Sequence, residues 1–203
     1  MNFYIADCHF GHGNIINFDH RPFADLYQME EVMVMLWNAA VRPSDTVYIL
    51  GDFHWGKAPE WLQLLKKLNG KKVLIEGNHD LSNYPAELKN QFEDITPFKE
   101  IVDNGRDNVS RKVLLSHYPM PFYKRANNEK YYMLCGHVHN TAENDLLEKW
   151  TKELRIGYQR GFGTHAANCG QIYNVGCMMP WMEYTPRTLD EIIKRWDACH
   201  REE

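Results

Sequence analysis

The chain has 203 residues and a formal net charge of −4, with 44% hydrophobic and 25% charged residues. This length and composition are typical of one globular domain with a sizeable core, and we expect a single domain over residues 1–203. The sequence has no long basic run. Tight, non-specific binding along duplex nucleic acid needs Lys and Arg to neutralise phosphates, so it is disfavoured, whereas a short nucleic-acid substrate is not.

The cysteines and the N-terminus favour the cytoplasm. Five cysteines are widely scattered, and none forms a CxxC pair: Cys8, Cys135, Cys169, Cys177 and Cys199. An odd, scattered set indicates reduced, mostly buried thiols rather than a disulfide framework or a thiolate zinc site. No secretory signal is visible, and no stretch approaches the ~18 apolar residues of a membrane span. We therefore expect a cytoplasmic protein with no membrane partner.

The first half of the chain alternates strand and helix patterns. In chain order these are a strand at Asn2–Ala6, a helix at Gln28–Ala40, a strand at Thr46–Leu50, a helix opened by Pro59 and a strand at Lys72–Ile75. Apolar runs of four or five residues suit buried strands, and apolar residues at helical spacing suit helices packed on a sheet. This alternation predicts βαβ units with helices outside a central sheet.

The second half is richer in strand patterns. It reads as strands at Phe98–Asp103, Val109–Ser116, Lys130–Cys135 and Gln171–Val175, a helix at Asn144–Arg155, and a last helix capped by Thr188 and Glu191. The first two strands flank Asn104-Gly105, which is typical of a hairpin or a longer loop. The Thr-x-x-Glu spacing forms a capping box. The whole chain is therefore predicted to be a mixed, layered α/β domain.

Polar residues of the metal-ligand types follow the apolar runs. They are Asp7 and His9 after the first run, Asp52 after the second, Asn78, His79 and Asp80 after the third, His117 after the fourth, and His137 and His139 after the fifth. In layered α/β proteins, ligand sites gather beyond the carboxyl ends of the strands. We therefore expect these side chains to meet at one site.

The spacing and chemistry of this set favour metal ions. Asp7 and His9 are two residues apart, so an extended segment would project both side chains to the same ion. His137 and His139 share the spacing, although a turn after Gly136 could aim them at two adjacent ions. Asp, Asn and His without thiolate suit Mn, Fe, Ni or Zn rather than Ca, and imidazole weighs against a site for Mg alone.

The ordered motifs resemble the signature of the calcineurin-like metallophosphoesterase superfamily. The segments are Asp7-Cys8-His9, Gly51-Asp52, Gly77-Asn78-His79-Asp80, His117 and Gly136-His137-Val138-His139, in the family's order over residues 7–139. The opening HFGHGNIINF and the closing NVGCMMPWMEYTPRTLDEI resemble small bacterial and phage members. The resemblance implies a four-layer α/β/β/α sandwich, in which two mixed sheets pack together with helices outside.

The resemblance also implies a role for each motif residue. Asp7, His9 and His139 would bind a first metal, Asn78, His117 and His137 a second, and Asp52 would bridge both. His79 would lie near the leaving oxygen as a general acid or electrostatic stabiliser, oriented by Asp80. The cofactors would be two divalent transition-metal ions, with Mn expected first and Fe, Ni or Zn as alternatives.

The implied activity is phosphoester hydrolysis. A hydroxide that bridges the two metals would attack phosphorus. Phosphodiesters and phosphomonoesters both stay open, with nucleotides and short nucleic acids among the candidate substrates. The alternative is a non-catalytic interaction module that keeps the fold. The sequence does not determine the oligomeric state.

Three further residues are candidates for substrate binding. His12 could contact phosphate or support a ligand, or could be a loop histidine bonded to backbone. His54, two residues after Asp52, could line the site. Arg21 could pair with a phosphate or anchor its own loop.

Two other features have an expected place in the fold. The Gly-rich segment 157–170 carries Arg160 and His165, and it could be either a flap over the site or a solvated connector. Trp61, Trp150 and Trp196 occur in amphipathic helices, and we expect all three in the core.

Overall fold

The computed structural model describes residues 1–105, 107–162 and 169–200. Its elements are β1 (Asn2–Ile5), α1 (Ile15–Phe18), α2 (Leu26–Ala40), β2 (Thr46–Leu50), α3 (Ala58–Leu65), β3 (Lys71–Ile75), α4 (Ala86–Lys89), β4 (Asp94–Thr96), β5 (Phe98–Asp103), β6 (Arg111–Ser116), β7 (Tyr131–Cys135), α5 (Ala142–Phe162), β8 (Gln171–Asn174) and α6 (Leu189–Cys199). The elements predicted from the sequence are present, together with short α1, α4 and β4, which were not predicted.

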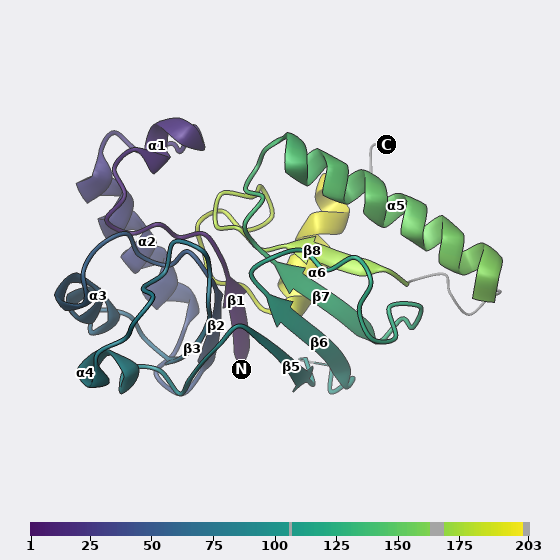
Figure 1. The fold of residues 1–203 in the computed structure, drawn as a ribbon, viewed down its shortest axis with the longest axis horizontal. Helices are drawn as coiled ribbons and strands as arrows, with labels where there is room; N and C mark the ends of the chain where they lie inside the picture. Colours follow the sequence, from purple (N-terminus) through teal and green to yellow (C-terminus); the bar gives the residue numbers. More distant parts are fainter. Residues whose placement is uncertain (106, 163–168, 201–203) are drawn as a thin grey trace.

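Two four-stranded sheets form the centre of the molecule. The first has the order β1-β2-β3-β4 and the second the order β5-β6-β7-β8. Every pair in the first sheet is parallel, whereas β5 pairs antiparallel with β6 in the second. Figure 1 shows α1 to α4 on one side of the sheets and α5 and α6 on the other. The four-layer α/β/β/α fold is confirmed, although only the second sheet is mixed.

Apolar side chains from both sheets share one core. Ile5, Ile49 and Leu74 of the first sheet join Val113 and Leu134 of the second in a single buried cluster. Parallel strands are covered on both faces, which explains why their sequences are continuous apolar runs. Each fully buried side chain of this size contributes about 1.5–3 kcal/mol. This core holds the carboxyl ends of both sets of strands at one place.

Helix α5 is longer than predicted. It extends over Ala142–Phe162, so the first part of segment 157–170 is helical, including Arg160. A Cβ added at Gly157 or Gly161 would meet nothing within 4 Å, so these glycines face open space and the helix passes through them. The remaining part of that segment, with His165, falls largely outside the described residues.

The three tryptophans have different environments. Trp61 is fully buried, and Trp196 packs on the ring of Tyr173 at 5.5 Å between centroids. Trp150 is 55% exposed, so its predicted place in the core was wrong. It lies off the buried stripe of α5 that includes Leu147 and Thr151, and it lines a shallow apolar groove with Phe122.

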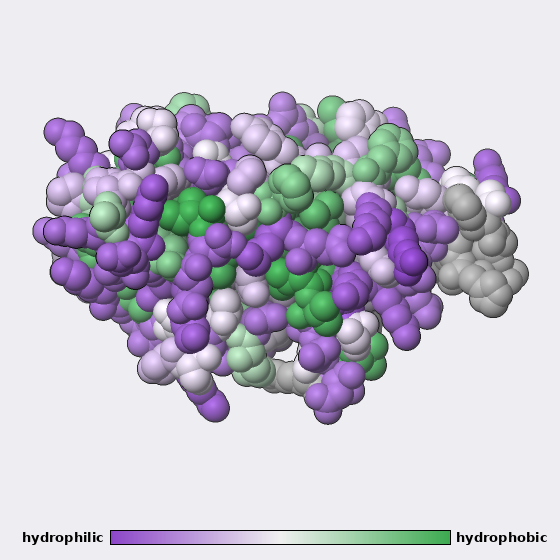
Figure 2. All heavy atoms as spheres, turned by 60° about the horizontal axis from the view of Figure 1, so that its bottom comes forward, coloured by the Kyte–Doolittle hydropathy of each residue, from purple (hydrophilic) through white to green (hydrophobic). Residues whose placement is uncertain are grey.

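The surface carries apolar patches between hydrophilic residues (Figure 2). Large exposed apolar residues include Phe98 and Val102 on β5. Within the described part of the chain, no helix has the length and apolar character needed to cross a membrane. All five cysteines are free thiols, and all but Cys199 are buried, as the sequence predicted.

Candidate metal centre

The candidate site lies where five strands end. Asp7 follows β1, Asp52 follows β2, Asn78 follows β3, His117 follows β6, and His137 and His139 follow β7. The loops meet closely. A Cβ added at Gly51 would lie 2.4 Å from Nδ1 of His117 and 2.7 Å from Cα of Gly77. Gly51 also has a φ of +83°, so only glycine suits this junction between the sheets.

Four predicted ligands surround one small space. Suitable ligand atoms of Asp7, His9, Asp52 and His139 all lie within 4.8 Å of one another. Nε2 of His9 is 3.3 Å from Nε2 of His139 and 3.6 Å from Oδ2 of Asp52. Convergent imidazole nitrogens and carboxylate oxygens form a donor set suited to a divalent transition metal.

The other three predicted ligands lie beside this group. Nε2 of His117 is 2.9 Å from Oδ1 of Asn78 and 3.6 Å from Oδ2 of Asp52. The ring of His137 is 5.1 Å from that of His117. The same oxygen of Asp52 is therefore 3.6 Å from a histidine of each group.

Several predicted ligands have a left-handed backbone. The φ angles are +53° at Asp7, +50° at His9, +50° at Asp52, +71° at His137 and +47° at His139. This conformation costs a non-glycine residue about 1–3 kcal/mol and persists only where the surrounding structure holds it. The expectation that an extended segment aligns Asp7 with His9 was therefore wrong. The side chains converge because the loops turn sharply, and backbone contacts hold these turns.

Burial shifts the titration of the ligand groups. Burial raises the pKa of Asp7 to about 7, and the nearby negative charge of Asp52 adds to the effect. Burial lowers the pKa of His9 to about 2, helped by the neighbouring His139. A neutral imidazole is the form that binds metal, and a buried carboxylate needs a cation beside it. The residues present thus fit metal ions at this place.

Asp19 holds the predicted ligand His139, and the sequence interpretation missed it. Nδ1 of His139 is 2.8 Å from Oδ1 of Asp19, which leaves Nε2 facing the site. Such carboxylate partners fix the ring and tautomer of metal-binding histidines. Residues 19 and 139 are 120 positions apart and meet only in the folded chain, so no local pattern in the sequence indicates that they pair.

Arg21 anchors the loop instead of facing substrate. Its guanidinium donates to the carbonyl oxygens of Asp7 and Cys8 and to the carboxylate of Asp19, at 2.7–2.9 Å. Nη1 also contacts the sulfur of Met29. The side chain is buried and its donors are used within the protein. The substrate-binding prediction for Arg21 is therefore corrected in favour of its loop-anchoring alternative.

Asp80 binds backbone rather than the ring of His79. Its carboxylate accepts hydrogen bonds from the backbone N–H groups of Gly77 at 2.8 Å, Phe53 at 2.9 Å and Asp52 at 3.1 Å. Burial raises the pKa of Asp80 to about 6. These bonds join the loops after β2 and β3, so the predicted orienting role is corrected to a positioning role for the loops.

His79 is exposed at the rim of the site. Its backbone N–H donates to Oδ1 of Asp52 at 2.8 Å, and its ring is 5.8 Å from the ring of His9. The side chain is thus free to approach a bound substrate while its backbone helps to fix Asp52.

His12 and His54 have different surroundings. His12 is half-buried at the rim, 5.6 Å from the ring of His9, and it stacks on Trp55 with 4.4 Å between centroids. His54 is buried and packs near Trp61 and against the backbone at Gly11. The neighbours described for His54 thus belong to helix α3 and to the loop after β1, and its place in the lining of the site stays a prediction.

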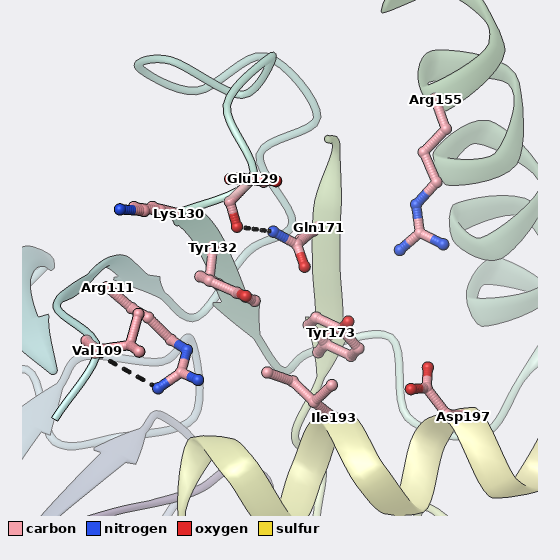
Figure 3. A pocket seen from close by; sticks show the side chains of 10 residues that line it. All are labelled: Val109, Arg111, Glu129, Lys130, Tyr132, Arg155, Gln171, Tyr173, Ile193 and Asp197. Carbon is pink, nitrogen blue, oxygen red and sulfur yellow. Dashed lines mark hydrogen bonds between the residues drawn. The ribbon is translucent and has the colours of Figure 1, made fainter. Parts of the chain in front are cut away.

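A separate cavity of about 390 Å³ lies at the other ends of the strands (Figure 3). Its lining includes the first residues of β6 and β8, Arg111 and Gln171. Arg111 pairs with Asp107 at 2.7 Å, and Gln171 donates to the carbonyl oxygen of Glu129 at 2.7 Å. These polar groups bind the loops that precede β6 and β7, and the predicted ligands lie at the opposite strand ends.

The chain belongs to the calcineurin-like phosphoesterase family. The family model matches residues 3–162, which is more than half of the chain and includes every predicted ligand. The match agrees with the two-sheet architecture and with a buried cluster of Asp and His side chains able to hold a metal ion.

Relatives resemble this chain over different lengths. The uncharacterized protein MJ1445 of Methanocaldococcus jannaschii is 45% identical over 37% of this chain and 44% of its own length. The Gene 66 protein of Mycobacterium phage L5 is 32% identical over 38% of each chain. These matches thus span less than half the length of either curated relative. The solved structure of the protein of unknown function AQ665 from Aquifex aeolicus has a TM-score of 0.64 at 28% identity, covering 96% of this chain and 98% of that one.

Proposed function

We propose that this chain is a dinuclear, metal-dependent phosphoesterase that hydrolyses phosphodiesters or phosphomonoesters. The observation that carries the proposal is the position of Asp52, whose Oδ2 is 3.6 Å from His9 on one side and 3.6 Å from His117 on the other. One carboxylate between two ligand groups suits a bridging role. Mn is the first candidate metal, with Fe, Ni and Zn as alternatives.

The residues of the site would have separate roles in binding metal, in assisting the leaving group and in positioning the loops. Asp7, His9 and His139 would hold one ion and Asn78, His117 and His137 the other, with Asp52 shared between them. When bound, such ions supply a water of lowered pKa and positive charge for the phosphoryl oxygens. His79, exposed at the rim, would donate a proton to the leaving oxygen or stabilise the negative charge that develops on it. Asp80 would keep the loops in register.

We extend the proposal to the whole chain and its setting. A structural relative that aligns with 96% of the chain supports one metallophosphoesterase domain over residues 1–203. Buried, unpaired thiols support a cytoplasmic location. A non-catalytic interaction module would not need buried acids or a left-handed backbone at this place, so both features favour the enzyme.

The test compares Asp52→Ala and His79→Ala with wild type, in Mn²⁺, on 4-nitrophenyl phosphate and bis(4-nitrophenyl) phosphate. Asp52→Ala is expected to lose both bound metal and activity. His79→Ala is expected to keep its metal while turnover falls about 10²–10⁴-fold. His200→Ala, which removes a histidine at the C-terminal end of α6 that stacks on Trp196, is the control.

Two results would contradict these assignments. Near-normal turnover by Asp52→Ala would overturn its bridging role, and loss of metal from His79→Ala would overturn the role given to His79. A wild-type protein that binds no transition metal and hydrolyses neither ester would instead support the non-catalytic interaction module.

A further inference from the structure

An exposed indole lies on one side of the candidate metal centre. Trp55 is 46% exposed, although its ring stacks on His12 with 4.4 Å between centroids and an interplanar angle of 15°. The same ring is 5.1 Å from the ring of His79. Scattered exposed apolar residues are common, so exposure alone carries no argument. The position of Trp55 carries the argument, because its neighbours His12 and His79 lie at the rim beside His9.

An exposed phenol lies beside the other ligand group. Tyr118 directly follows His117 and is 48% exposed. Its ring is 4.6 Å from the ring of His137, and its hydroxyl is 3.5 Å from Oδ1 of Asn78. Its neighbours are thus the three residues proposed to hold the second metal.

The arrangement is a buried polar floor with one aromatic ring beside each half. Asp7, His9, Asp52 and His117 are at most 3% exposed. A phosphodiester has an organic group on each side of its phosphorus, whereas a monoester has only one. Every nucleobase has a flat face that stacks on aromatic side chains, without regard to sequence. A dinucleoside phosphodiester carries only one negative charge, so contacts to its two bases would have to contribute much of its affinity.

We propose that Trp55 and Tyr118 are substrate-binding residues that stack the two bases of a nucleoside phosphodiester, one on each side of the scissile phosphate. The catalytic part of this inference rests on the proposed function. The binding part does not, because a dinucleotide can be bound without being cleaved.

The experiment uses four deoxydinucleotides that differ only in their bases: both adenines, either one replaced by an abasic tetrahydrofuran, or both replaced. Hydrolysis is followed as kcat/KM with Mn²⁺. Binding of the corresponding phosphorothioates, which resist hydrolysis, is followed by calorimetry. The proteins are wild type, Trp55→Ala and Tyr118→Ala. Trp150→Ala and Tyr27→Ala are matched controls, since they remove exposed aromatics from α5 and α2.

Each site variant is expected to weaken binding of the two-base ligand at least about fivefold. The loss should disappear when the base on the corresponding side is already abasic, because the variant and the missing base then remove the same contact. The controls should change neither quantity.

The design distinguishes failure of the stacking inference from failure of the proposed function. Equal losses for base-bearing and abasic ligands in Trp55→Ala and Tyr118→Ala, or no loss at all, would overturn the stacking inference even if all ligands are cleaved. Base-dependent binding that Trp55→Ala and Tyr118→Ala each weaken, in a protein that cleaves none of the four dinucleotides, would support the stacking inference and contradict the diester branch of the proposed function.

Discussion

At the scale of single residues, the site depends on groups that do not face its centre. Asp19 sits between His139 and Arg21, at 2.8 Å from the imidazole and 2.7 Å from the guanidinium. The negative charge of Asp19 orients the imidazole of His139 and is balanced by the guanidinium of Arg21. Arg21 in turn holds the carbonyl oxygens of Asp7 and Cys8. One ion pair thus positions predicted ligands from two distant segments.

Replacing Asp19 with Asn should weaken metal binding. The amide keeps the size of the side chain but lacks the charge that orients His139, and such changes typically cost 10–100-fold in metal affinity, so we expect a loss of about that size. Calorimetric titration with Mn²⁺ measures the loss, and thermal unfolding checks that the fold survives. Asp25→Asn is the control, because Asp25 caps α2 by accepting from the N–H of Gln28 and Asn caps equally well. Unchanged affinity in Asp19→Asn would contradict this role.

Tyr4 should make the protein sensitive to alkali. Its hydroxyl donates to the buried carboxylate of Asp103 at 2.5 Å, and burial, followed by the charge of Asp103, raises the pKa of Tyr4 well above its ordinary value. A tyrosine in the unfolded chain loses its proton near pH ~10, whereas Tyr4 in the folded chain does not. The raised pKa therefore contributes stability below pH ~10 that is lost as pH rises further.

Urea unfolding of metal-free protein between pH 8 and pH 11 tests this effect. Tyr4→Phe should lower stability at pH 8 by about 1–3 kcal/mol, because the buried Asp103 loses a donor. It should also reduce the decline of stability above pH ~10 relative to wild type. Tyr27→Phe, at a 74% exposed position, should change neither. An undiminished decline in Tyr4→Phe would show that Tyr4 is not responsible.

At the scale of elements, the ends of β2 and β3 set the geometry of the site. A Cβ added at Gly77 would lie 2.4 Å from both the backbone nitrogen and Oδ1 of Asp52, and one added at Gly51 would collide with His117. The close approach of these two loops is what places Asp52 between the ligand groups.

Two glycine-to-alanine changes should therefore differ in their effect on activity. Gly51→Ala, at a φ of +83°, should displace His117 or the loop and reduce both metal binding and hydrolysis at least about tenfold. Gly157→Ala, inside α5 with open space around it, should leave activity unchanged and raise stability by about 0.5–1 kcal/mol. Calorimetry, unfolding curves and ester hydrolysis measure these effects. Full activity in Gly51→Ala would mean that the junction tolerates a side chain.

The sequence was sufficient for features that depend on local pattern. Apolar runs that end at Asp7, Asp52 or Asn78 predicted both the strands and the place where their polar residues meet. The left-handed backbone at Asp7 and His9 was not predictable, since close packing between loops enforces it. The hydrogen bond between Asp19 and His139 was not predictable either, because the two residues are 120 positions apart in the chain. Exposure of Trp150 also depends on which stripe of α5 faces the sheet.

At the scale of the whole molecule, the site joins the two sheets. Asp7 and Asp52 follow strands of the first sheet, whereas His117 and His139 follow strands of the second. Ions bound between them would link both halves of the core. A ligand that binds only the folded state adds to its stability, so Mn²⁺ should raise the unfolding temperature of wild type, and EDTA should reverse the rise.

The central claim is that Asp52 is shared by two metal ions, and counting the ions tests it most directly. Elemental analysis of protein saturated with Mn²⁺ and then desalted should give two ions per chain for wild type, with hydrolysis of bis(4-nitrophenyl) phosphate rising as the sites fill. Asp52→Ala should retain fewer than one ion per chain. Wild-type protein that is fully active with one ion or none, or Asp52→Ala that retains two, would contradict the account.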